Sequence, residues 1–367
     1  MKIIKNKRTI FLTGATGLVG SHLLKTFLKN GHRVYVLSRE SHQKRAKERV
    51  SGAVDFWDRH VLRKNSDNLF VCVGDVVEDG LGLNAKQREV FKNSVEEIVH
   101  AAAITDFNRP MQEIQKVNVE GTRNVLELAS DIGQSGNPLR VSHISTAYLY
   151  GDFMGVFSED ALDKGQKFAN NYEETKFKAE LLIQEYRKKG LWIDIYRPSI
   201  VIGDSQTGRN FRFKHIYQFI DLLKTEIFDY LPLRGCSVSL VPVDLLSEAI
   251  YRIWNNAKER NKTYHPFPRQ LISIPLIIDM AAELLDFKTP RLISLQDFRM
   301  QDLTPVQRTI LKNSILSDSF KTHLDSGFTN AILKKFDFIF PEIDTKMLTR
   351  TFQYYFRKKK TKVSVGG

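Results

Sequence analysis

"TIFLTGATGLVGSHLLKTFLK", residues 9–29, carries the clearest structural signal in the chain. It opens with a short apolar run, typical of a buried strand. Gly14, Gly17 and Gly20 follow, and from Leu18 to Lys29 the apolar residues recur at helical spacing. A glycine-rich turn between a strand and a helix lets backbone N–H groups approach a pyrophosphate at the helix N-terminus. The order of strand, loop and helix therefore predicts a dinucleotide site rather than an ordinary turn.

The expected contacts to the dinucleotide in this segment are Thr13, Gly14, Thr16, Gly17, Leu18, Val19 and Gly20. The next strand, "RVYVLSRE", should end beside the adenosine ribose. There Arg39 suits a 2′-phosphate, whereas Glu40 would suit a free 2′-hydroxyl. We predict NADP(H) in preference to NAD(H). Asp75, after the third strand, either contacts the adenine amino group or caps a turn.

Strand-like and helix-like segments alternate through the first two hundred residues. The apolar runs are Thr9–Thr13, Arg33–Leu37, Leu69–Val73, Glu97–Ala101, Arg140–Ser145 and Trp192–Arg197. Helical periodicity fills most of the intervals, as in residues 117–131. This pattern predicts an α/β fold with a Rossmann-type doubly wound parallel sheet, which binds ligands at the carboxyl ends of its strands.

The alternation decays after residue 199, where glycine and proline punctuate shorter helical pieces. We therefore predict a Rossmann domain at residues 1–200 and a smaller, mostly helical substrate lobe at 201–345. Parts of 235–255 should return to the first domain. Residues 346–367 form a basic C-terminal tail in this interpretation.

Charge is concentrated at the ends of the chain, whose net charge is +13. Residues 346–367 contain no acid and the bases Lys346, Arg350, Arg357, Lys358, Lys359, Lys360 and Lys362. We expect a solvated tail. Contact with an anionic membrane surface or an acidic acyl carrier protein is the alternative. No motif supports nucleic-acid binding, and the oligomeric state stays open.

Cysteine content and hydropathy bear on the compartment. Cys72 and Cys236 cannot form a disulfide framework and lack metal-ligand spacing, so no metal is expected. No signal peptide is recognisable in the short, glycine-interrupted apolar run near the start, and no apolar run reaches the roughly 20 residues that span a bilayer. We expect a cytoplasmic protein, with peripheral membrane association as the variant that the basic tail would allow.

"NNYEETKFKAE", residues 170–180, places Tyr172 and Lys176 one helical turn apart on the same face. The same spacing recurs at Tyr354/Lys358 and Tyr355/Lys359 in the tail, so spacing alone decides nothing. Only Tyr172 follows a strand that ends in a hydroxyl residue, Thr146. A phenol, an ammonium and a hydroxyl in one crevice would suit proton donation to a carbonyl oxygen.

Six motifs follow one another along the chain, and their order indicates a family: "TGATGLVG", "HAAAITDF", "NVEGTRNVLELA", "HISTAYLYG", "YEETK" and "YRPSIVIGDSQTG". Over about residues 8–250 the chain resembles the extended short-chain dehydrogenase/reductase superfamily. The last three motifs resemble its thioester reductase and fatty acyl-CoA reductase-like branch.

The resemblance implies roles residue by residue. Thr146, Tyr172 and Lys176 correspond to the catalytic hydroxyl, the proton donor and its lysine partner, and Lys176 would also hold the nicotinamide ribose. The positions beside the cofactor are Ala101, Ala102, Ala103, Arg197 and Pro198. Asn118 matches a structural or proton-relay asparagine, although simple helix packing explains "NVEGT" equally well.

The resemblance further implies an NADPH-dependent oxidoreductase that reduces acyl thioesters, as acyl-CoA or carrier-bound acyl chains, to an aldehyde or an alcohol. Two alternatives stay open. One is another enzyme of the superfamily, such as a nucleotide-sugar epimerase or dehydratase or a hydroxysteroid-type alcohol dehydrogenase. The other is a non-catalytic dinucleotide-binding scaffold or sensor.

Several other polar residues have a structural explanation beside a functional one. His100 and His143 are expected to be packed or bonded to the backbone within strand ends. Asp106 either lies on the substrate path or caps a loop. A second set is either solvated or meets the phosphate of CoA or phosphopantetheine: Arg209, Arg212 and His215.

Overall fold

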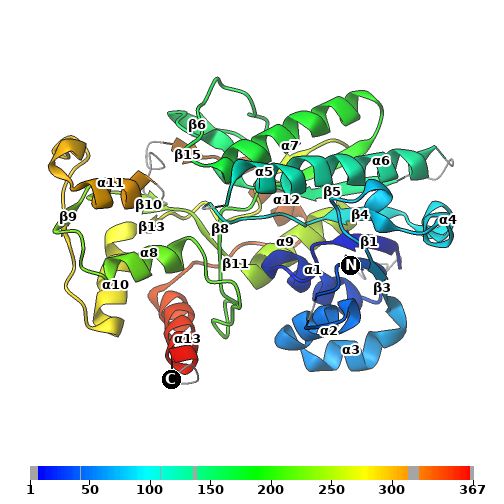
Figure 1. Cartoon of the computed structure of the whole chain (residues 1–367), viewed down its shortest axis with the longest axis horizontal. Coiled ribbons are helices and arrows are strands. Elements are labelled where there is room, and N and C mark those ends of the chain that lie inside the picture. The colour runs from blue at the N-terminus through cyan, green and yellow to red at the C-terminus, as the bar shows by residue number, and fades with distance from the viewer. Residues whose placement is uncertain (1–6, 42, 108, 135–138, 313–321, 364–367) are drawn as a thin grey trace.

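The computed structural model describes residues 7–41, 43–107, 109–134, 139–312 and 322–363 (Figure 1). At its centre is a seven-stranded sheet in the order β12-β7-β5-β4-β1-β2-β3. The strands are β1 (Thr9–Thr13), β2 (Arg33–Ser38), β3 (Leu69–Val73), β4 (Glu97–His100), β5 (Arg140–Ile144), β7 (Trp192–Tyr196) and β12 (Thr263–Tyr264). Every pairing in this sheet is parallel. The predicted Rossmann-type α/β fold is confirmed, and the strand order reverses between β1 and β4, where such sheets bind ligands.

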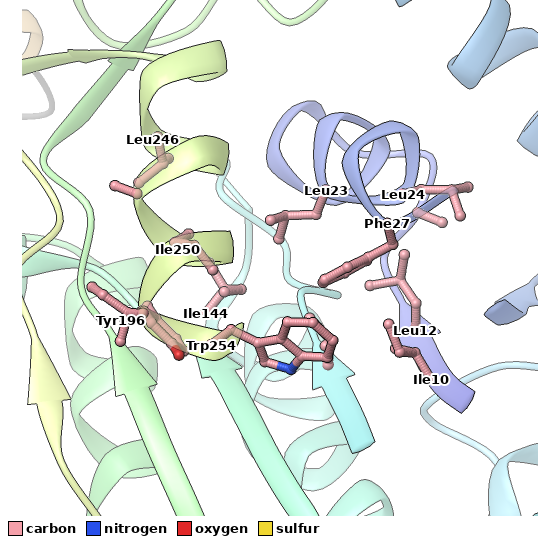
Figure 2. Close-up of a cluster of buried hydrophobic side chains, with 14 of the residues drawn as sticks. Ile10, Leu12, Leu23, Leu24, Phe27, Ile144, Tyr196, Leu246, Ile250 and Trp254 are labelled. Atoms are coloured by element: carbon pink, nitrogen blue, oxygen red, sulfur yellow. The ribbon is translucent and has the colours of Figure 1, made fainter. Parts of the chain in front are cut away.

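Helices cover both faces of the sheet because successive strand residues point to opposite sides. Ile10 and Leu12 of β1 belong to one buried cluster, whereas Phe11 between them belongs to another. The first cluster packs against α1 (Leu18–Lys29), α2 (Ala46–Trp57) and α9 (Val243–Asn256); the second packs against α4 (Ala85–Ser94), α6 (Gly121–Gly133) and α7 (Asn171–Lys188). Figure 2 shows the first cluster, where the rings of Phe27 and Trp254 lie 5.0 Å apart.

Two segments from the second half of the chain join this Rossmann domain. Helix α9 lies against α1, and β12 extends the sheet beyond β7. The sequence predicts the return within residues 235–255. The structure supplies it with Val243–Asn256 and with a two-residue strand further on.

A separate apolar cluster holds the C-terminal lobe together, and its helices α8, α10 and α13 lie away from α2 and α3 (Figure 1). The lobe contains α8 (Ile216–Leu223), α10 (Ile274–Leu285), α11 (Pro305–Lys312), α13 (Thr345–Val363) and the strand pairs β8 (Ile200–Ile202) with β11 (Leu240–Pro242), β9 (Tyr230–Leu231) with β14 (Arg291–Leu292), and β10 (Ser237–Val238) with β13 (Ile272–Ser273). The other elements are α3 (Arg59–Asn65), α5 (Met111–Gln115), a π-helical turn (Lys116–Glu120), α12 (Gly327–Lys335), and β6 (Gly155–Phe157) paired with β15 (Thr322–Leu324).

The expected basic tail is a helix, α13, over Thr345–Val363. Its apolar side chains recur at helical spacing, so one face is buried in the C-terminal lobe, whereas Lys346, Arg357, Lys358 and Lys359 are exposed. Phe352 is fully buried, and the Tyr355 hydroxyl donates to Asp221 at 2.5 Å. The expected solvated tail is therefore a packed helix over Thr345–Val363. Residues 364–367 lie outside the part of the chain that the structure describes.

Phe352→Ala should lower the free energy of unfolding by about 3–5 kcal/mol, because it removes a fully buried ring from a packed core. Denaturant unfolding of the whole chain measures this loss. Gln353→Ala, the exposed neighbour on the same helix, should change stability by less than about 0.5 kcal/mol. Equal stability of the two variants would contradict the packed helix.

Candidate active site

A cleft of about 730 Å³ opens at the carboxyl ends of the sheet strands. The loops after β1, β2, β4, β5 and β7 contribute to its walls, together with the first turns of α1 and α7. Every site residue predicted from the sequence as catalytic or cofactor-binding lines it, apart from Arg197: Thr13, Gly14, Thr16, Gly17, Leu18, Val19, Gly20, Arg39, Asp75, Ala101, Ala102, Ala103, Thr146, Tyr172, Lys176 and Pro198.

The glycine loop fits a pyrophosphate because its backbone is bare and close-packed. Gly14 has φ +74°, and a side chain there would clash with the backbone of Ala101 and Ala102. A side chain at Gly20 would clash with the Gly14 carbonyl. No side chain caps the N-terminus of α1 at Gly17. The N–H groups of its first turn are therefore available to an anion.

Thr146 and Tyr172 meet at the nicotinamide end of the cleft. Thr146 ends the β5 segment, and its hydroxyl oxygen accepts from the Tyr148 backbone N–H at 3.2 Å. Burial raises the pKa of Tyr172 to about 12, while a hydrogen bond with Thr146 opposes the rise. Tyr172 is consequently a neutral phenol at physiological pH and holds a proton to give.

Lys176 is buried one turn further along α7. Its ammonium donates to the Ile144 carbonyl at 2.9 Å and to His143 Nε2 at 3.1 Å. Burial lowers the Lys176 pKa to about 8, and the charge of Glu180 partly opposes this. Burial and the neighbouring Lys176 charge also lower the pKa of His143, so the imidazole is neutral and accepts from the ammonium.

His100 belongs to a second buried polar chain, between β1 and α6. Thr13 Oγ1 accepts from the Ala102 N–H and lies 2.7 Å from His100 Nδ1. On the other side His100 Nε2 lies 3.1 Å from the Thr122 hydroxyl, which donates to the Asn118 carbonyl. These directions make Nδ1 the acceptor and Nε2 the donor of a neutral ring. His100 is packed, as one of the two expectations had it, but its bonds go to the Thr13 and Thr122 side chains and not to the backbone.

Arg197, expected beside the nicotinamide, lies behind the cleft wall instead of in it. Its guanidinium forms a buried ion pair with Glu180 of α7, with Nη2 and Oε2 2.6 Å apart. Glu180 also accepts from the Ser145 hydroxyl at 2.5 Å, and Arg197 donates to the Ala161 carbonyl at 2.8 Å. The pair thus ties the helix of Tyr172 and Lys176 to the residue before Thr146.

Asn118 lies in the π-helical turn beside α7. Its side chain accepts from the Ile104 N–H at 2.8 Å and donates to the Ile104 carbonyl at 3.0 Å. It also donates to Thr175 at 3.1 Å. These bonds fix the loop after β4 against the helix that carries Tyr172.

Arginines gather at the adenosine end. Arg39 lies 3.4 Å from Asp75 and is largely exposed. Arg49 of α2 donates to the Arg39 carbonyl at 2.5 Å and lines the cleft. Sequence reasoning missed Arg49, although the basic run "QKRAKER" that includes it was a signal.

A loop of the C-terminal lobe borders the cleft opposite the sheet. Lys214 forms an ion pair with Asp106 at 3.0 Å, and the Phe107 ring lies 4.8 Å from His215 and 5.7 Å from Tyr172. Asp106 therefore lines the cleft and is bonded to Lys214 across it. Arg212 also lines the cleft, whereas Arg209 does not line it.

Two further cleft residues were missed, Tyr148 and Glu173. Burial raises the pKa of Glu173 to about 7, which the bond from the Asn170 side chain at 2.9 Å opposes. Both stand inside motifs that drew attention for other residues, "HISTAYLYG" and "YEETK". Nothing in their spacing separated them from helix-capping or packing positions.

Within the described part of the chain, no cluster of three or more His, Cys, Asp or Glu side chains is placed to hold a metal ion. No helix among those residues is long and apolar enough to cross a membrane.

Comparisons with known proteins give consistent findings. A family model described as "Male sterility protein" matches residues 12–250. The chain is similar to the non-ribosomal peptide synthetase asaC of Aspergillus flavus, with 27% identity over 71% of this chain and 26% of that protein. It is similar in fold to a thiolation-reductase di-domain from an archaeal non-ribosomal peptide synthetase (TM-score 0.80, 21% identity, 96% of this chain and 76% of that one). It is also similar to UDP-glucuronic acid 4-epimerase from Bacillus cereus (TM-score 0.65, 20% identity, 94% and 98%).

Fold and cleft define a Rossmann-type protein of the NAD(P)-dependent oxidoreductase class. The chain belongs to the male sterility protein family, in the thioester-reductase branch of the extended short-chain dehydrogenase/reductase superfamily. Its cofactor is a nicotinamide dinucleotide. The chain spans only 7% to 27% of the length of the curated relatives that it matches.

Lys176→Met should raise the free energy of unfolding at pH 7, because it removes a buried charge. A pKa of about 8 in place of 10.5 means that burying the protonated lysine costs on the order of 3 kcal/mol. The lost bond to Ile144 offsets part of the gain. Above pH 10.5 the lysine is neutral in both the folded and the unfolded state. The difference between variant and wild type should therefore shrink as pH rises from 8 to 10.5.

Denaturant unfolding at pH 7 and pH 10 tests this. Lys178→Met, on the same helix but with 42% of its side chain exposed, is the matched control for the loss of one lysine from this helix. A pH-independent difference for Lys176→Met would contradict the depressed pKa.

Proposed function

We propose that the chain is an NADPH-dependent reductase of acyl thioesters, which it converts to an aldehyde or an alcohol. The observation that supports this most is the placement of Thr146, Tyr172 and Lys176 on the cleft that also holds the glycine loop. The substrate is a small acyl thioester such as an acyl-CoA, or an acyl chain on a carrier protein. The names of the relatives and of the di-domain neighbour favour the carrier-bound form.

The proposed mechanism divides the work among three side chains. The bound dinucleotide supplies the hydride. Thr146 donates a hydrogen bond to the thioester oxygen and stabilises the charge that develops there. Tyr172 then transfers its proton to that oxygen. Lys176, positively charged below its pKa of about 8, favours the phenolate that remains.

In this proposal, the protonation of Lys176 limits the pH range in which Tyr172 can act as proton donor. The Lys176 ammonium must stay charged to stabilise the phenolate, and its pKa is about 8.

Transfer of the hydride and the proton to the thioester gives a hemithioacetal, which collapses to an aldehyde and a thiol. A second round of reduction would give the alcohol.

Carrier recognition would use the basic surface near the cleft. Arg357 and Lys358 are exposed on α13, and this helix packs against the loop that carries Lys214. An acidic carrier protein fits this surface by charge. An anionic membrane surface is the second partner that the same charges would suit.

NADPH oxidation should be followed with acyl-CoAs, acyl-carrier thioesters, aldehydes and UDP-sugars in turn. Oxidation with thioesters supports the proposal. A tightly held NAD(H) that is not consumed would instead favour the nucleotide-sugar epimerase alternative. Cofactor binding with no turnover of any substrate would favour a non-catalytic sensor.

Tyr172→Phe should leave the dissociation constant of NADPH nearly unchanged while turnover falls by about 10²–10⁴-fold, the usual contribution of a positioned proton donor. Steady-state rates and cofactor titration measure the two effects. Tyr354→Phe, which alters the same Tyr-x-x-x-Lys spacing in α13, is the matched control and should keep full turnover. Unchanged turnover in Tyr172→Phe would remove this residue from the mechanism.

Arg39→Ala should weaken NADPH binding about 10–100-fold, because a charge-assisted hydrogen bond to the 2′-phosphate contributes about 1.5–3 kcal/mol. NADH binding should change little. Arg45→Ala, an exposed base nearby that does not line the cleft, serves as control. Equal weakening of NADPH and NADH would argue against the choice of NADP(H).

A further inference from the structure

Arg212 stands on the cleft wall together with two arginines from the other half of the molecule. Arg39 follows β2 and Arg49 lies on α2, so both belong to the Rossmann domain, whereas Arg212 is carried by a loop of the C-terminal lobe. After burial itself, the charges of Arg39 and Arg212 are the causes that lower the pKa of Arg49. Arg49 therefore lies between the charges of the other two arginines, and all three side chains line the same cleft.

Contacts between the lobe and α2 hold Arg212 in place. The Phe211 ring packs on Phe56 and Trp57 at 4.9 and 5.7 Å, so the loop rests on the end of α2. The backbone N–H of Arg212 donates to Asn210 at 2.7 Å. Arg209 lies with its guanidinium 4.6 Å above Phe56 and takes no part in the cleft lining.

Few acidic side chains neutralise the positive charges of Arg39, Arg49 and Arg212. In the described part of the structure, Asp75 is the acid paired with Arg39, at 3.4 Å, and neither Arg49 nor Arg212 forms an ion pair. Gathering like charges costs free energy unless an anion lies between them. A phosphate monoester carries up to two negative charges and accepts bidentate bonds from guanidinium groups.

We propose that Arg212 joins Arg39 and Arg49 to bind the 2′-phosphate of NADPH, so that the cofactor phosphate bridges the Rossmann domain and the C-terminal lobe. This rests on the proposed function in that it takes NADPH as the cofactor. The bridge also has a consequence for the substrate side, because Lys214 and His215 closely follow Arg212 and face Asp106 and Phe107. Occupation of the arginine site orders the loop beside Tyr172.

Equilibrium binding tests the proposal without any substrate. Dissociation constants of NADPH, NADH, 2′,5′-ADP and 3′,5′-ADP are measured for wild type, Arg212→Ala, Arg212→Gln and the control Arg209→Ala. Both Arg212 variants should bind NADPH and 2′,5′-ADP about tenfold more weakly, with NADH changed less than about twofold. Arg209→Ala should keep the wild-type ratio of NADPH to NADH affinity.

Hydrogen exchange gives a second readout. In wild type, NADPH should protect residues 204–215 more than NADH does, and Arg212→Gln should remove this difference. Equal weakening of NADPH and NADH by the Arg212 variants would overturn the proposal. Weakening of 3′,5′-ADP alone would also overturn it and assign Arg212 to the CoA phosphate.

The outcomes separate this proposal from the proposed function. Wild type that binds NADH as tightly as NADPH would overturn both the three-arginine site and the choice of NADPH. Wild type that prefers NADPH, with the preference kept in both Arg212 variants, would overturn the role of Arg212 alone. A loss of preference in those variants supports the site even where no thioester is reduced.

Discussion

The buried ion pair between Arg197 and Glu180 is the interaction on which the geometry of the cleft depends. Arg197 follows the β7 strand and Glu180 lies on α7, and both side chains are almost completely buried. Through Ser145 and Ala161 the same charges reach the end of β5 and the following turn. Removing one partner from such a pair costs about 3–5 kcal/mol, although two apolar residues often replace a buried pair without loss. A positioning role explains the pair better than stability does.

Lys176 is linked to the same pair by charge. Glu180 lies one turn further along α7 and favours the protonated lysine against the cost of burial. One carboxylate therefore pairs with Arg197 and also acts on the charge of Lys176, beside the proposed proton donor Tyr172. The neighbouring His143 is neutral because burial and this lysine lower its pKa. Of the two bonded side chains behind Tyr172, Lys176 carries the charge and His143 is neutral.

The sequence predicted what depends on local pattern. Six strands, the glycine loop and α1 follow from apolar runs and turn residues, and the cleft lining follows from the rule that ligands bind at the carboxyl ends of strands. The positions of Arg49 and Glu180 escaped because they arise from side chains that meet only after folding, whereas Arg212 was considered only for the phosphate of CoA or phosphopantetheine. The two residues of β12 are too few to show periodicity. The burial of α13 was missed because its many bases favoured a solvated tail, although Phe352 and its aromatic neighbours would also have suited a helix.

The ion pair between Asp106 and Lys214 is one of the contacts that join the two sides of the cleft. Its side chains are 37% and 29% exposed, and such partly solvated pairs contribute about 1 kcal/mol or less. That is little more than thermal energy, so the contact breaks and re-forms often. Salt screens it further. Passage of the proposed thioester beside this pair should therefore depend on ionic strength.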